Sequence, residues 1–137
     1  MEFLENLHQY SDYGLLALRI ALGVIFLVHG TMKWAMWKMQ PSPQMPASMI
    51  GMMKFLSIVE PLGGLAILAG FLTELATIGL SLVMLGAIYF KITQWKVPFM
   101  SQTNTGWEFD FINLAGLIAL ILMGGGAFAF DQYISLF

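Results

Sequence analysis

Seven ionisable or amide side chains interrupt apolar stretches of the chain, and they are the residues whose types could support chemistry: His29, Lys33, Glu60, Lys91, Glu108, Asp110 and Asn113. If the apolar stretches are helices that alternate in direction, all seven fall toward one pole of the molecule. Ionisable groups inside membrane spans are costly and tend to face a bundle interior or a water-filled cavity. The set is therefore predicted to form a polar pocket that could hold the headgroup of a ligand. A structural interpretation stays open, in which these charges only pair helices and fix their register.

Arg19 precedes His29 and Lys33 in the same apolar stretch but lies toward the opposite pole. At 100° per residue the three side chains fall within about 80° of one another, so they share one stripe of a helix. This stripe is predicted to face the core. Glu74 and Asp131 are the candidate partners of Arg19 at its pole, and structural ion pairing is predicted there.

A copper site is a weaker alternative interpretation of the region around His29. The thioethers of Met32 and Met36, together with His29, could hold Cu(I). The simpler interpretation is that methionine fills irregular apolar gaps, and the three prolines between residues 41 and 46 disrupt regular ligand spacing. No metal site is therefore predicted. The chain has no cysteine, which excludes disulfides and cysteine-ligated iron–sulfur clusters within it. No cofactor is firmly predicted, although a bound quinone is possible.

The elements that must position these residues are membrane helices. Hydrophobic residues make up 58% of the chain and charged residues 10%, where about 25% is usual. About 20 apolar residues cross a bilayer core, and four such runs are present. Their predicted ranges are 13–33, 49–71, 75–93 and 107–130. Short connections favour antiparallel neighbours, so the predicted fold is an all-α, antiparallel four-helix transmembrane bundle forming a single domain over residues 1–137. Pro61 predicts a kink or a restart in the second helix.

Three segments in this order resemble the DoxX family of small membrane proteins. They are 15–33, with LLALRIALG followed by HG and K; 60–73, with EPLGG and GFLT; and 106–131, with GWEFD, GGG and D. The resemblance implies a four-helix bacterial inner-membrane protein whose family takes its name from a subunit of a thiosulfate:quinone oxidoreductase. It also implies that the polar residues typical of the family are Arg19, His29, Lys33, Glu60, Glu108 and Asp131.

The functional hypothesis is a quinone-linked subunit or accessory of a membrane oxidoreductase, with no catalytic residue assigned. A small-solute or copper carrier and a purely structural membrane module are the alternatives. The expected location is the plasma (inner) membrane with several passes, and the expected surroundings are lipid, an oxidoreductase partner or a second copy of the chain. A nucleic-acid partner is not expected, because the net charge is −2 and no basic patch is present.

Overall fold

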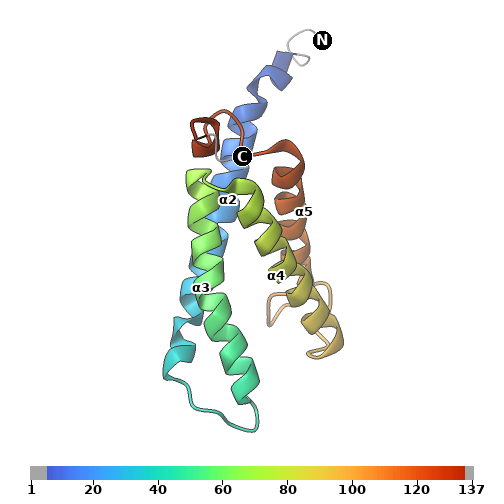
Figure 1. Cartoon of the computed structure of the whole chain (residues 1–137). Coiled ribbons are helices and arrows are strands. Elements are labelled where there is room, and N and C mark those ends of the chain that lie inside the picture. The colour runs from blue at the N-terminus through green and yellow to red at the C-terminus, as the bar shows by residue number, and fades with distance from the viewer. Residues whose placement is uncertain (1–5, 135–137) are drawn as a thin grey trace.

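The computed structural model describes residues 6–134, and in this part of the chain all the regular elements are helical (Figure 1). The four long helices are α2 (Ser11–Met32), α3 (Ala47–Ala69), α4 (Thr73–Thr93) and α5 (Trp107–Met123). Short 3-10 turns are η1 (Asn6–Tyr10), η2 (Lys33–Lys38) and η3 (Phe130–Gln132). Successive long helices run in opposite directions, so the predicted antiparallel four-helix bundle is confirmed.

Three helical segments are long and apolar enough to cross a membrane: Asn6–Lys38, Ala47–Ala69 and Thr73–Thr93. The fourth helix, α5, has 17 residues and extends about 25 Å at 1.5 Å per residue. Large apolar side chains cover the outside of the bundle; Leu62, Leu82 and Leu122 are 62%, 66% and 79% exposed. Such a surface is stable only where lipid is the solvent. The chain is a multi-pass membrane protein.

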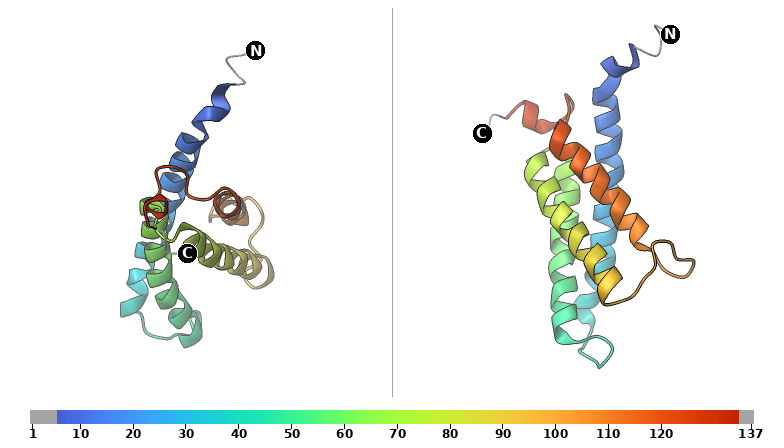
Figure 2. Two further views of the ribbon diagram at one scale, coloured as in Figure 1. Left: turned by 45° about the horizontal axis from the view of Figure 1, so that its top comes forward. Right: turned by 90° about the vertical axis from the view of Figure 1, so that its right-hand side faces the viewer.

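The helices pack as two hairpins, α2 with α3 and α4 with α5, and contacts between the hairpins are fewer (Figure 2). Small residues allow the close approach of α2 and α3. A Cβ on Gly23 would lie 2.8 Å from the carbonyl oxygen of Gly64, and a Cβ on Gly30 would collide with the ring of Pro61. α3 continues through Pro61 without interruption, so the alternative of a restarted helix is wrong.

The Lys33–Lys38 turn, which directly follows α2, is held against α3 by tryptophan hydrogen bonds. The Nε1 atom of Trp34 donates to the carbonyl oxygen of Ser57 at 3.0 Å, and that of Trp37 donates to the Ser57 hydroxyl at 2.9 Å. This attachment fixes the end of α2, where Lys33 begins η2.

The C-terminal segment closes the opposite pole. Asp131 caps α4: its carboxylate accepts the backbone N–H groups of Leu72 at 2.7 Å and of Thr73 at 2.9 Å. These amides would otherwise lack partners at the helix start. α4 therefore begins at Thr73, two residues before the predicted start. Gly70 ends α3 with φ +68°, in a conformation that favours glycine.

The predicted ion pairs of Arg19 with Glu74 or Asp131 are not formed, and this prediction is corrected. Arg19 is 1% exposed and donates to the carbonyl oxygens of Ile67 at 2.9 Å, Leu68 at 2.8 Å and Gly125 at 3.2 Å. Glu74 is exposed. The last turn of a helix leaves carbonyl groups without intrahelical partners, and Arg19 donates to two carbonyl groups in this turn of α3.

The last helix is shorter than predicted. α5 ends at Met123 rather than near Phe130, because Gly124 and Gly126 adopt φ +75° and +76°. After this break the chain turns toward α2, and the N–H of Ala127 donates to the carboxylate of Asp12 at 2.9 Å. The glycine triplet thus brings Asp131 to the α3–α4 turn instead of extending the helix.

Candidate functional site

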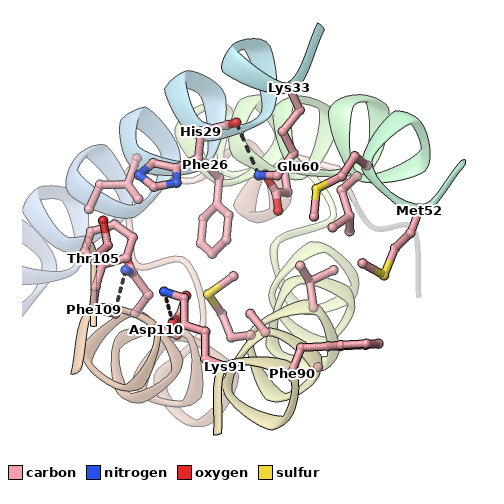
Figure 3. A pocket seen from close by; sticks show the side chains of 18 of the residues that line it. Phe26, His29, Lys33, Met52, Glu60, Phe90, Lys91, Thr105, Phe109 and Asp110 are labelled. Carbon is pink, nitrogen blue, oxygen red and sulfur yellow. Dashed lines mark hydrogen bonds and ion pairs between the residues drawn. The ribbon is translucent and has the colours of Figure 1, made fainter. Parts of the chain in front are cut away.

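A cavity of about 420 Å³ lies between the two hairpins, at the pole away from the α3–α4 turn (Figure 3). All four long helices contribute to its walls. Six of the seven predicted pocket residues line it: His29, Lys33, Glu60, Lys91, Asp110 and Asn113. Their convergence follows from the alternating direction of the helices, which brings the end of α2, the middle of α3, the end of α4 and the start of α5 to one level.

An ion pair within the α2–α3 hairpin forms one wall. Lys33 contacts the carboxylate of Glu60, whose side chain is 4% exposed. The same ammonium donates to the carbonyl oxygen of His29 at 3.3 Å. The pair forms because the close contact of Gly30 with Pro61 brings α2 and α3 together one turn away.

A second ion pair within the α4–α5 hairpin forms the facing wall (Figure 3). The Nζ atom of Lys91 lies 2.6 Å from the carboxylate of Asp110, and their side chains are 15% and 7% exposed. Lys91 also donates to the carbonyl oxygen of Gly106 at 3.3 Å. Asn113 stands one turn further along α5 and donates to the carbonyl oxygen of Phe109 at 2.7 Å. The two walls therefore have the same design, a lysine held by a carboxylate and a backbone carbonyl.

His29 connects the two hairpins. Its ring stacks on Phe109 of α5, with the ring centres 4.9 Å apart and the planes 19° from parallel. Both rings line the cavity. The imidazole is thus held beside the space between the two ion pairs, where it could exchange a hydrogen bond with a bound group.

Apart from Thr105, the rest of the cavity lining is apolar, and most of these residues were not among the predicted pocket residues. Phe26, Met52, Met53, Met84 and Phe90 are the main contributors. Phe26 could have been found, because it lies three residues before His29 and thus on the same helix face. The methionines could not have been assigned to the cavity from the sequence, because their positions along the helices are those of ordinary core residues.

Two further predictions differ from the structure. Glu108 is not among the residues that line the cavity; its carboxylate turns back over Gly106, so its placement in the pocket is corrected. It occupies the first turn of α5, where negative charge favours the helix start. The three residues of the alternative copper site do not come together either. His29 faces the cavity, whereas Met32 is 71% exposed and Met36 lines no part of the cavity.

The chain is similar to one protein family and to two known bacterial proteins. The sequence profile of the DoxX family matches residues 14–92, which span α2, α3 and α4. A Bacillus subtilis protein named "Putative oxidoreductase CatD" is 32% identical over 127 residues, covering 90% of this chain and 88% of that protein. A Haemophilus influenzae protein named "Uncharacterized protein" is 26% identical over 137 residues, covering 94% and 96%. No solved structure matches. The match over more than half of the chain, together with the helical bundle, shows that the chain belongs to the DoxX family of membrane proteins.

Proposed function

We propose that this protein is a quinone-binding subunit or accessory of a membrane oxidoreductase, and that the cavity holds the quinone headgroup. The observation that carries the proposal is the pair of lysine–carboxylate contacts on facing walls of a cavity whose remaining lining is mostly apolar. A 1,4-quinone has the matching form, since its flat apolar ring carries a carbonyl oxygen at each end. Binding cavities for small molecules commonly have about 300–1,000 Å³ and a few polar groups in an apolar wall.

Hydrogen-bond capacity supports the same ligand class. A lysine ammonium has three donors. Lys33 uses two of them on Glu60 and the His29 carbonyl, whereas Lys91 donates one to the Gly106 carbonyl and holds Asp110 by charge. At least one N–H of each ammonium therefore has no hydrogen-bond partner within residues 6–134 and is available to a ligand carbonyl. The carboxylates neutralise the lysines, so a neutral ligand fits better than an anion.

The role assigned to the chain is binding and not electron transfer by itself. The electrons would come from a partner oxidoreductase, which agrees with the word oxidoreductase in the name of the Bacillus subtilis relative. The location would be the plasma membrane, where quinones dissolve in the lipid.

A titration of the purified protein in detergent with a tail-less benzoquinone tests the proposal, with calorimetry as the readout. We expect saturable binding at one site. Glu60→Gln and Lys91→Met should each weaken it about tenfold or more, because a charged group that orders the ligand contact is lost. His29→Ala should weaken it as well.

Matched controls separate the site from general charge effects. Glu74→Gln and Lys96→Met change the same residue types at exposed positions outside the cavity, and they should leave the affinity unchanged. Absence of saturable binding to the wild type contradicts the proposal. Equal affinity of the wild type and of well-folded cavity variants contradicts it too.

A further inference from the structure

The cavity reaches the outer surface of the bundle between α3 and α4. Phe55 of α3 lines the cavity and is nevertheless 62% exposed. Gly86 and Phe90 of α4 line it from the other side. At this side chain the cavity lies directly next to the outer surface of the bundle.

The α3–α4 contact is tight near the connecting turn and open further along. A Cβ on Gly63 would lie 2.8 Å from Cδ1 of Leu80, so the two helices touch there. A Cβ on Gly86 would meet nothing within 4 Å, although Gly86 is on the same helix as Leu80. The helices diverge from their turn toward this level (Figure 1).

The opening lies at the depth of lipid chains. Phe55 stands 14 residues before the end of α3, and Gly86 stands 13 residues after the start of α4. Both are therefore about 20 Å from the turn at 1.5 Å per residue, within a hydrocarbon core of about 30 Å. The flanking side chains are apolar: Ile58 is 48% exposed and Leu82 is 66% exposed. A lipid-soluble molecule could approach this opening without meeting water.

From this geometry we infer that the ligand enters sideways from the bilayer between α3 and α4, and that it is a quinone with a long isoprenoid tail. The inference rests on the proposed function and adds the route and the tail. The headgroup would reach the Lys33–Glu60 and Lys91–Asp110 pairs, while the tail stays in the opening beside Gly86. The small side chains of Gly86 and Ala87 leave room for the tail.

The aqueous end of the cavity offers a second route, because exposed residues border the cavity there as well. Trp95 is 41% exposed, and Thr105 in the α4–α5 loop is exposed as well. An opening there would admit a water-soluble, tail-less quinone. Entry of a long-tailed quinone by this route would be unfavourable, because its apolar tail would lie in water. The two routes therefore predict different responses of tailed and tail-less ligands to a block beside Gly86.

The test uses Gly86→Leu in nanodiscs, with a ten-isoprene ubiquinone and its tail-less headgroup as ligands. We expect the variant to bind the tailed quinone about tenfold more weakly or worse and the tail-less one within about twofold of the wild type. Gly79→Leu is the matched control: it lies two turns earlier on the same face of α4, has no atom within 4 Å of its Cβ position, and does not line the cavity. It should bind both ligands as the wild type does.

If Gly86→Leu does not fold, the opening can be blocked after folding by chemical labelling. The chain has no cysteine, so Gly86→Cys provides a unique thiol. Labelling it with a bulky maleimide should reproduce the loss of tailed-quinone binding, and bound tailed quinone should slow the labelling. Gly79→Cys should show neither effect.

The outcomes distinguish the two proposals. If the blocked protein binds both quinones as the wild type does, or loses both equally, the sideways route is overturned while the quinone site stands. If the unblocked wild type binds neither quinone, the proposed function itself fails.

Discussion

The ammonium group of Lys91 lies 2.6 Å from the carboxylate of Asp110, so the charge at the end of α4 is neutralised within its own helical hairpin. Lys33 and Glu60 form the equivalent contact within the α2–α3 hairpin. At this level of the bundle, each hairpin therefore brings its buried lysine and carboxylate together as a pair. Since the pairs do not join the hairpins to each other, the space between them is left for the cavity.

Removing one residue of an ion pair should destabilise the protein more than removing both residues. Lys91→Met leaves Asp110 buried without its partner, and such a loss typically costs about 3–5 kcal/mol of unfolding free energy. The double variant Lys91→Met/Asp110→Leu removes both charges and should recover most of that loss. Thermal unfolding in one detergent measures all three proteins. A double variant that is no more stable than Lys91→Met would show that the two residues do not act as a pair.

Arg19 should matter for folding and not for the ligand. Arg19→Leu removes the three hydrogen bonds to the carbonyl oxygens of Ile67, Leu68 and Gly125, and hydrogen bonds from a charged group contribute about 2 kcal/mol each. Yield and melting temperature should therefore fall. The folded fraction should bind quinone as the wild type does, because Arg19 is at the pole away from the cavity. An unchanged melting temperature would contradict the structural role.

The acidity of Asp131 links pH to the stability of this pole. Burial alone would raise the pKa of Asp131, but its contacts with Thr73 and the Leu72 amide, and the charge of Arg19, hold that pKa below its usual value of 3.8. A lowered pKa means that the ionised carboxylate stabilises the folded state. This contribution is complete above pH 3.8 and is lost as the pH falls from there through the lower pKa of the folded protein.

Asp131→Asn tests this link. The variant should melt at a lower temperature than the wild type at pH 7, because an amide accepts the Leu72 and Thr73 amides less strongly than a carboxylate does. The difference should shrink as the pH falls below 3.8. Melting curves between pH 7 and pH 3 check both points. A constant difference across this range would mean that the charge of Asp131 has no part in the cap.

The apolar runs and the alternating helix directions were enough to predict the bundle and the polar pole from the sequence. Lys33, Glu60, Lys91 and Asp110 could be assigned to one level because position along a helix gives depth directly. The partners of Arg19 could not be predicted, since they are backbone carbonyl groups that only the folded α3–α4 turn and the glycine break present. Glu108 was misplaced for a related reason: its depth is that of the pocket, but its direction depends on how the loop before α5 turns at Gly106.

The contact between Gly30 and Pro61 should control the shape of the ligand site. A methyl group on Gly30 collides with the Pro61 ring, so Gly30→Ala must push α2 from α3 close to the Lys33–Glu60 pair. Such overpacking typically costs about 1–3 kcal/mol.

We therefore expect Gly30→Ala to lower the melting temperature and to weaken quinone binding together. Gly14→Ala, on the same helix but with no atom within 4 Å of its Cβ position, is the matched control. Because alanine is favoured over glycine inside a helix by about 0.5–1 kcal/mol, this control should be as stable as the wild type or slightly more stable. Both effects are measured on the same preparations by thermal unfolding and quinone titration. If Gly30→Ala melts and binds as Gly14→Ala does, α2 and α3 are not in the close contact that places Lys33 beside Glu60.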